Sequence, residues 1–379
     1  MQFSQIKGQN NVIRKLISAI DRNQFPHAVL INGKDGYGNL ALALALAQYI
    51  SCSNKDHTDS CGECSSCRKY QKLIHPDLHL IFPTNTTDKI KKDSKSSLFY
   101  SEFREFVLNN GGYGDLNDWL SFSGVEGKQG IINVADANDI VSLLNLKAYE
   151  AKYKIMLVWN VDRMNVQASN TILKILEEPY PNTIFIFTTE HKENILSTIL
   201  SRVQQINIGP IDNNVIEQEL QNLHPEYSEE RIKKDAFLSE GNILNIRQTY
   251  IDKVSEYFQL FIELNRLAAS YKTKASDILT FAETFSKMSK DIQKDFLSYC
   301  SKTIEKCWQY SIGMEFVQHP LYLAEEKFKK NYPKFITQNN LEGIFNVLEK
   351  SQKNIDRNAN VKINIMNMII KLGVLFEKK

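Results

Sequence analysis

The sequence has no large excess of one charge, few cysteines and no long apolar run. Its 379 residues carry 46 basic and 44 acidic side chains, which leave a formal net charge of +2. No whole-molecule field therefore draws the chain to nucleic acid or to an acidic partner, and any DNA contact needs a local patch. The hydrophobic content of 42% is enough for a large buried core. The length is typical of two or three domains.

Segments that would direct a chain to or through a membrane are also missing. The amino-terminal residues 1–7 are polar, unlike a signal peptide. The longest apolar candidate, residues 366–376, is interrupted by Lys371 and is too short to span a bilayer. We therefore expect a cytoplasmic protein, in which six cysteines indicate metal ligands or free thiols and not disulfides.

A phosphate-binding loop at residues 33–40 lacks its two working side chains. The segment reads Gly-Lys-Asp-Gly-Tyr-Gly-Asn-Leu, and the pattern G-x-x-x-x-G-K-[ST] requires a lysine and a hydroxyl where Asn39 and Leu40 stand. The candidate cofactor-binding residues that remain are Gly33, Gly36 and Gly38. A glycine-rich turn by itself is a weak signal, but this one follows a predicted strand at 28–31 and precedes a predicted helix at 41–52. The sequence therefore predicts an ATPase fold that has lost its ATPase chemistry.

A second site of the same chemistry is also incomplete. ATPases of this type carry acidic residues at the end of another strand, one for Mg²⁺ and one for the attacking water. The predicted strand at 154–159 runs instead into Trp159 and Asn160, with Asp162 two residues later. Neither strand-end position has a carboxylate, which agrees with the incomplete loop.

Strands that alternate with helices predict a parallel sheet in the first part of the chain. The predicted strands are 28–31, 77–82, 154–159 and 183–188. We predict an α/β domain of the P-loop type at 1–210, a small helical lid at 211–250 and an all-helical domain at 251–379. The first break is at Gly209-Pro210. The polar stretch 84–129 is interpreted as a surface insertion with no assigned role.

Four cysteines lie close together in the spacing C-x8-C-x2-C-x2-C. They are Cys52, Cys61, Cys64 and Cys67. Four thiolates suit a closed, structural, tetrahedral Zn²⁺ site, since each C-x2-C turn brings two sulfurs to one ion. Buried free thiols and an iron–sulfur cluster are the alternatives. Cys300 and Cys307 lie on a predicted helix and are expected to be core residues.

An arginine follows the last predicted strand and a short helix, in Ile199-Leu200-Ser201-Arg202-Val203. At such a position an arginine can reach across a subunit boundary and stabilise the charge on a transferring phosphoryl group. The alternative is an ordinary surface arginine paired with an acid, and spacing alone favours it. Ser201 and Arg202 are the candidate catalytic residues.

Further motifs surround this arginine and favour the catalytic interpretation over an ordinary surface arginine. They are Lys154-Ile155-Met156-Leu157-Val158, Asp162-Arg163-Met164-Asn165, Ala168-Ser169-Asn170, Leu173-Lys174-Ile175-Leu176-Glu177-Glu178-Pro179 and Phe187-Thr188-Thr189, preceded by Gly8-Gln9, Pro26-His27-Ala28 and His75-Pro76-Asp77. Together with the cysteine spacing, they resemble the AAA+ core of bacterial DNA polymerase III clamp-loader subunits. The resemblance covers most of residues 1–211, is weak from 212 to 350, and returns faintly at 357–360 and the final helix.

Within that family, a loop without the lysine and threonine resembles the stator subunit, whereas the gamma and tau motor subunits keep both residues. The resemblance implies a subunit at one end of a five-membered ring that binds no ATP productively and offers Arg202 to a neighbouring motor subunit. The implied partners are gamma/tau and the delta subunit, with the sliding clamp and primed DNA reached through the assembled complex. It also implies structural Zn²⁺ at the four cysteines and a collar at 251–379 that holds the ring together.

The chain departs from the family pattern at three places. Val203 stands where the family has a cysteine, the insertion 84–129 lies outside the common core, and 241–244 lacks the arginine of ATP-hydrolysing relatives. Two alternatives to a stator are an active ATPase with unusual ligands and a zinc-dependent nucleic-acid adaptor. The basic run 89–95 is interpreted as solvated surface in preference to a DNA site.

Overall fold

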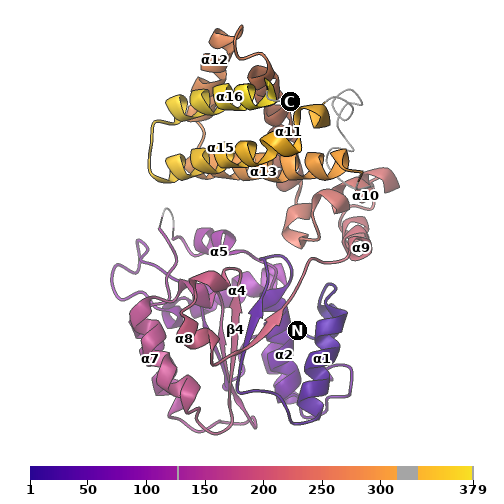
Figure 1. Cartoon of the computed structure of the whole chain (residues 1–379). Helices are drawn as coiled ribbons and strands as arrows, with labels where there is room; N and C mark the ends of the chain where they lie inside the picture. Colours follow the sequence, from indigo (N-terminus) through magenta and orange to yellow (C-terminus); the bar gives the residue numbers. More distant parts are fainter. Residues whose placement is uncertain (126–127, 314–331, 378–379) are drawn as a thin grey trace. The chain divides into compact units, whose positions relative to one another are not determined.

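Five parallel strands form the centre of the amino-terminal part of the chain (Figure 1). They are β1 (Ala28–Asn32), β2 (Leu78–Ile81), β3 (Lys154–Val158), β4 (Thr183–Thr189) and β5 (Gln204–Asn207), in the order β2-β3-β4-β1-β5. In this register Leu30 of β1 lies opposite Phe187 of β4 on one side and Gln205 of β5 on the other. The parallel sheet predicted from the alternating pattern is confirmed.

The computed structural model describes residues 1–125, 128–313 and 332–377, and it divides into two compact units, Met1–Ile246 and Arg247–Lys379. The helices predicted for the lid belong to the first of these units. The three-domain division, with its boundaries at 210 and 250, stays a prediction. Among the described residues, no helix combines the length and apolar character needed to cross a membrane.

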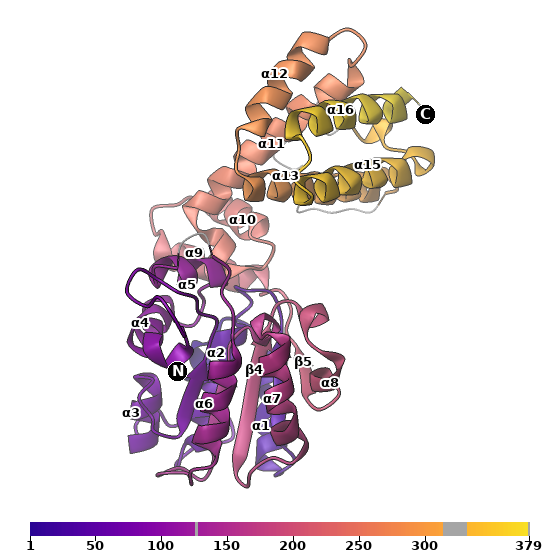
Figure 2. The ribbon, with the colours of Figure 1, turned by 90° about the vertical axis from the view of Figure 1, so that its left-hand side faces the viewer.

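Helices cover both faces of the sheet because the strands are apolar on both faces, as is usual in parallel sheets. One face carries α1 (Asn10–Asp21), α2 (Asn39–Ser51), α3 (Ser65–Gln71), α4 (Tyr100–Asn110) and α5 (Leu116–Phe122). The other carries α6 (Val134–Leu144), α7 (Val166–Glu177) and α8 (Ser197–Leu200). Figure 2 shows α6 and α7 in front of the sheet. Successive residues of β1 alternate between the two cores, with Val29 and Ile31 on one side and Ala28 and Leu30 on the other.

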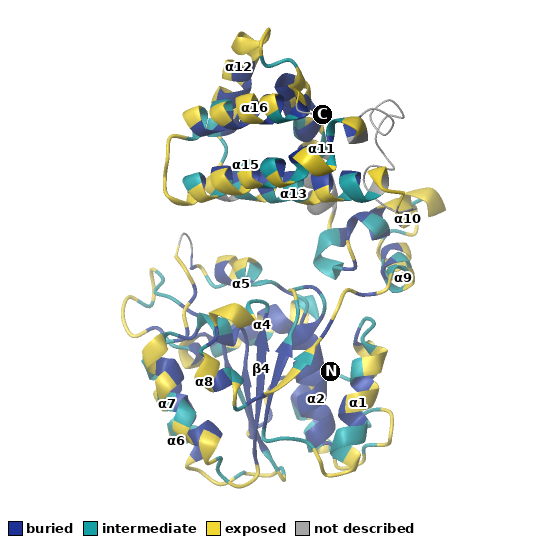
Figure 3. Cartoon of the chain, viewed as in Figure 1, coloured by how far each residue is buried: buried dark blue, intermediate teal, exposed yellow. Residues whose placement is uncertain are grey.

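Local sequence explains where these helices begin. The side chain of Asn133 accepts the backbone N–H groups of Ala135 and Asp136 and so caps α6. Asn165 caps α7 in the same way, accepting the N–H of Ala168 at 2.8 Å. α2 is apolar on all sides, and every residue from 39 to 50 is buried (Figure 3). Such a helix can exist only inside the core.

The stretch 84–129 folds more than its polarity predicted. It forms the short helix η2 (Ser96–Phe99) and then α4 and α5. Phe103, Phe106 and Trp119 of these helices are buried. The interpretation of this stretch as a surface insertion is therefore corrected in part: it is helical here, and its aromatic residues form an apolar helix face that packs into the core.

The first unit ends in a small helical group with its own apolar core. It comprises α9 (Asn213–Leu223), α10 (Glu229–Leu238) and η5 (Ile243–Ile246), packed through Ile211, Ile216, Leu220, Ile232, Ala236 and Ile246. Short 3-10 turns elsewhere in this unit are η1 (Phe3–Gln5), η3 (Val161–Arg163) and η4 (Lys192–Asn194).

The second unit is helical throughout its described residues. It contains α11 (Gln248–Ala269), α12 (Ala275–Ser286), α13 (Lys290–Ser311), η7 (Tyr332–Phe335), α15 (Gln338–Asp356) and α16 (Val361–Glu377). α16 packs on α11, α12 and α15. Cys300 and Cys307 are fully buried in this core, which confirms the prediction made for them. The α/β fold followed by helices is therefore confirmed.

Candidate functional site

The glycine-rich loop at 33–40 makes a tight turn before α2. Gly36 and Gly38 adopt φ angles of 86° and 94°, which glycine reaches without strain. Gly38 is the N-cap residue of α2. The Asn39 amide donates to the Gly33 carbonyl at 3.1 Å, and its own oxygen accepts the Leu40 N–H at 3.0 Å. The residue at the lysine position is thus tied to the loop itself.

The environment of the loop is acidic. Burial, followed by the nearby carboxylates of Glu190 and Asp115, raises the pKa of Asp35 to about 8. A working phosphate loop offers positive charge and free N–H groups to an anion. This loop instead places a buried acid among two other acids.

The strand-end position that would hold Mg²⁺ carries the buried indole of Trp159. The next residue, Asn160, has a left-handed φ of 53°. Asp162 accepts the Thr189 hydroxyl at 2.7 Å and pairs with the Arg163 guanidinium at 3.5 Å. Its carboxylate therefore organises the turn after β3.

Arg202 lies just after α8 and is about one-third exposed. Its Nη2 pairs with Glu177 Oε1 at 2.5 Å, and its Nη1 donates to the Thr198 carbonyl at 2.8 Å and to the Ser201 hydroxyl at 2.9 Å. The pairing with an acid is the arrangement that spacing alone favoured. An exposed pair of this kind contributes only about 0–1 kcal/mol, so a stronger anion can displace Glu177.

The four cysteines of the predicted metal site come together. Their sulfur atoms all lie within 4.8 Å of one another, with 3.5 Å between Cys52 and Cys61 and 3.9 Å between Cys61 and Cys67. Zn–S bonds of about 2.3 Å give a tetrahedron with edges of about 3.8 Å, so the spacing fits one ion. A disulfide needs about 2.05 Å, and all four cysteines are free.

Backbone geometry prepares these sulfurs for a metal. The N–H groups of Cys61, Cys64 and Cys67 point to the sulfurs of Cys52, Cys61 and Cys64 at 3.3–3.4 Å. Burial would raise the pKa of Cys64, but hydrogen bonds from Ser53 and Cys67 outweigh it and lower the pKa to about 6. Thiolate is the form that binds a metal. Cys52 also lines a cavity of about 730 Å³.

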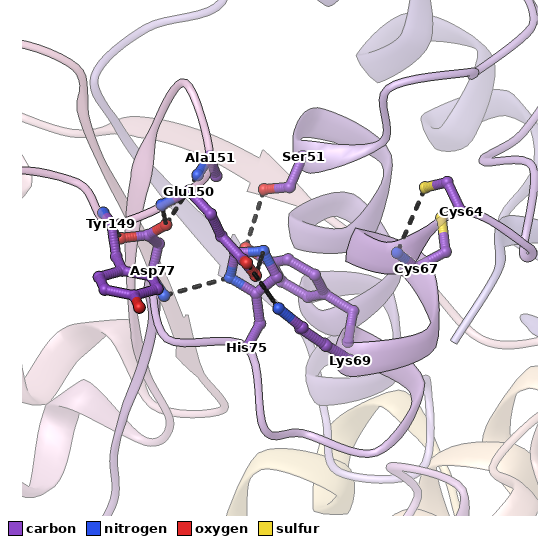
Figure 4. A network of polar contacts seen from close by, with 10 residues as sticks. Ser51, Cys64, Cys67, Lys69, His75, Asp77, Tyr149, Glu150 and Ala151 are labelled. Atoms are coloured by element: carbon purple, nitrogen blue, oxygen red, sulfur yellow. Dashed lines mark hydrogen bonds and ion pairs between the residues drawn. The ribbon is translucent and has the colours of Figure 1, made fainter.

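A network of charged groups connects this metal site to residues 149–151 (Figure 4). The Asp77 carboxylate accepts three backbone N–H groups, from Tyr149, Glu150 and Ala151, at 2.6–2.9 Å. The Glu150 carboxylate is held by Lys69 at 2.5 Å and lies 3.2 Å from the buried His75 ring. Lys69 belongs to α3, the helix that carries Cys67.

Sequence reasoning did not assign roles to the members of this network. The available signal was His75-Pro76-Asp77, which follows the cysteines directly. Its partners at 149–151 are more than seventy residues away, so only the folded chain reveals the pairing.

The Asp77 network predicts an acid-sensitive contribution to stability. Burial raises the pKa of Asp77, but the three backbone N–H groups outweigh it and hold the pKa below its usual value. A depressed carboxyl pKa stabilises the fold above the unfolded pKa of about 3.9, and this contribution is lost as pH falls through the folded pKa. We expect Asp77→Asn to destabilise the protein by about 2 kcal/mol at pH 7, and by less as the pH falls below 4.

Urea unfolding of both proteins from pH 3 to pH 7 measures this difference. Asp139→Asn is a suitable control, since its carboxylate pairs with two side chains near the surface, Lys95 and Ser97, and, among the described residues, with no backbone N–H. A gap between wild type and Asp77→Asn that stays constant with pH would contradict the assignment.

Comparison with known proteins finds relatives of the first unit. Residues 8–212 match the family described as DNA polymerase III, delta subunit. The DNA polymerase III subunit delta' of Bacillus subtilis is 28% identical over 212 residues, 56% of this chain and 51% of that protein. The delta' subunit of Haemophilus influenzae is 28% identical over 198 residues, 52% of this chain and 47% of that protein.

Motor-type subunits and solved structures also match. The gamma/tau subunit of Mycoplasma genitalium is 26% identical over 264 residues, 68% of this chain and 36% of that protein. A gamma subunit-related protein from Thermotoga maritima aligns over 97% of this chain and 99% of that chain, at 17% identity and a TM-score of 0.39. The fold assignment therefore rests on the observed parallel sheet and its flanking helices, and not on this likeness. The chain spans about half the length of the delta' relatives it matches.

Proposed function

Since the chain belongs to the DNA polymerase III delta-subunit family, whose matches here include delta' subunits, we propose that it is the non-hydrolysing stator of a clamp loader. In this role it helps to load the sliding clamp onto primed DNA. The observation that carries the proposal is an incomplete phosphate loop in the same domain as a retained, partly exposed Arg202. The chain does not turn over ATP itself and acts on the ATP of a neighbour.

Three features support a silent nucleotide site. Asn39 is tied back to Gly33 and cannot replace the lysine that contacts phosphate. Leu40, at the hydroxyl position, is buried and offers no oxygen to Mg²⁺. Trp159 stands where a carboxylate would hold the same ion. Each missing group removes a contact that nucleotide hydrolysis needs.

The role proposed for Arg202 is to stabilise charge on the γ-phosphate bound by an adjacent motor subunit. Its guanidinium is partly exposed, and its single acidic partner, Glu177, is half-exposed. A triphosphate carries more charge than one carboxylate and accepts a bidentate contact, so it competes well for this arginine. Ser201 orients the guanidinium by accepting from Nη1.

The remaining parts serve assembly. The four cysteines bind a structural Zn²⁺ that fixes α3 to the end of α2, with no open position for catalysis. The helices of 251–379 form the collar, where α16 exposes Ile363, Ile370 and Val374 on one face. We propose gamma/tau and delta subunits as direct partners, the clamp and primed DNA as partners of the complex, and the cytoplasm as the location.

Reconstitution with the motor subunits tests the proposal. We expect the isolated chain to show no binding of Mg·ATP by calorimetry, and to raise the DNA-stimulated ATPase rate of the motor subunits when added to them. Firm binding and hydrolysis by the chain alone would indicate an active ATPase instead. Tight DNA binding without association with motor subunits would indicate a nucleic-acid adaptor.

A further inference from the structure

We propose that α4, α5 and the turn between them, residues 100–122 of the inserted segment, are a built-in plug that closes the degenerate nucleotide site of this chain. The inference rests on the proposed function, because a plugged site suits only a subunit that need not turn over ATP itself. It assigns a role to a segment that neither the fold nor the stator function explains. Two separate segments contact the phosphate loop, one on each side.

The turn between α4 and α5 covers the start of α2. A Cβ atom built on Gly38 would lie 3.0 Å from Cε1 and 3.1 Å from the hydroxyl of Tyr113. One built on Gly112 would lie 2.9 Å from the Cα of Ala41, so the turn's backbone lies against the first residues of α2. In a working loop, this helix start and the loop N–H groups are where phosphates bind.

Tyr113 is held beside Gly38 by contacts of both its hydroxyl and its ring. Its hydroxyl accepts the backbone N–H of Lys7 at 2.7 Å. Its ring packs against two apolar clusters, the core beside α2 and the small core of α9 and α10. Burial is the main reason that its pKa is raised to about 12, so the hydroxyl stays neutral.

The helices on either side of the turn are anchored in the core. Phe103 of α4 stacks on Phe82 with 3.8 Å between ring centroids, and Trp119 of α5 contacts both rings edge-on at 5.1–5.2 Å. Phe103 and Phe106 also contact Trp159 at 5.5 and 6.2 Å. The insertion therefore uses the indole that replaces the magnesium-binding carboxylate as part of its own support.

The helical group at the end of the first unit contacts the loop as well. The Asn242 amide donates to the Asp35 carbonyl at 2.7 Å, and the Ile243 N–H points to the Gly36 carbonyl at 3.2 Å. A Cβ atom on Gly36 would overlap the Asn242 oxygen at 1.8 Å. Tyr113 covers the loop near Gly38 and Asn242 covers it near Gly36.

The insertion also adds negative charge at the loop. Asp115, the N-cap residue of α5, lies near enough to Asp35 to raise its pKa, as Glu190 does after β4. Carboxylates at this place repel a triphosphate, whose binding depends on positive potential. Steric closure and negative charge therefore both oppose the binding of a nucleotide.

Restoring the missing side chains tests the plug. Asn39→Lys with Leu40→Thr rebuilds the loop pattern, and we expect this double variant still to show no Mg·ATP binding by calorimetry. Adding Tyr113→Ala should open the site and strengthen binding at least tenfold. Adding Tyr149→Ala instead is the matched control, since Tyr149 is 83% exposed and belongs to another loop; it should not restore binding.

Two outcomes overturn the plug: Mg·ATP binding by the double variant with Tyr113 in place, or a folded triple variant that binds no better than the double variant. Hydrogen exchange on the wild-type chain provides a test that needs no variant. The amides of 36–40 should exchange as slowly as those in the middle of α2, and fast exchange would contradict closure. Firm Mg·ATP binding by the wild-type chain would instead contradict the proposed function.

Discussion

Replacing Arg202 with alanine should slow ATP turnover at the adjacent motor-subunit site at least tenfold, and lower the total turnover of the assembled loader, while leaving the chain folded. An arginine that contacts the transferring phosphoryl group contributes about 10³–10⁵ in rate where it acts alone. The expected loss is smaller in a ring, because the other ATP sites keep their own arginines. The folded chain loses the partly exposed pair with Glu177 and two exposed hydrogen bonds, to Thr198 and Ser201, so its stability should change by about 1 kcal/mol.

Steady-state ATPase assays on complexes containing wild-type or Arg202→Ala chains measure this effect. Arg14→Ala is the matched control, since Arg14 is an exposed arginine of α1 on a different part of the first unit. The two variants should assemble equally well with the motor subunits. Unchanged turnover by the Arg202→Ala complex would remove the arginine from the mechanism.

Cys64→Ser should remove the metal from the purified protein and destabilise the first unit. Cys64 caps α3 through its sulfur and supplies one of four converging thiolates. Three thiolates and a hydroxyl bind Zn²⁺ more weakly, and a metal that binds only the folded state stabilises that state directly. We expect a loss of about 3 kcal/mol or more, which lowers the Tm of a unit of this size by about 10 °C.

Metal analysis and scanning calorimetry give the two readouts. The wild-type protein should contain one zinc per chain, and an added chelator should lower its Tm toward that of the variant. Cys307→Ala is the control for metal content, because this buried thiol belongs to the second unit. Wild-type protein that contains no metal, or a Cys64→Ser protein that retains it, would show that the cluster has another purpose.

The local features of this chain could be predicted because their signals are short and regular. The strands β1, β3 and β4 are continuous apolar runs, which indicate strands buried on both faces. The cysteine spacing is one that suits four thiolate ligands of a single ion. The absence of the lysine and the hydroxyl is found by comparing residues 33–40 with the pattern G-x-x-x-x-G-K-[ST].

Contacts between distant segments could not be predicted in this way. The stretch 84–129 was interpreted as a surface insertion because its average composition is polar, whereas Phe103, Phe106 and Trp119 of α4 and α5 are buried in the core beside the sheet. The pairing of Arg202 with Glu177, and of Asp77 with 149–151, depends on how separate elements pack. No periodic pattern in the sequence indicates which distant residues pair.

The sequence by itself determined which side chains the loop at 33–40 lacks and how the four cysteines are spaced. A residue that is absent from a loop cannot be supplied by packing, and thiols at ligand spacing converge wherever the local turns form. Only the tertiary structure decided what fills the space around the incomplete loop. Tyr113 lies seventy-five residues after Gly38 and Asn242 lies two hundred and six after Gly36. Contacts over such distances in sequence form only when apolar faces from separate segments are buried together.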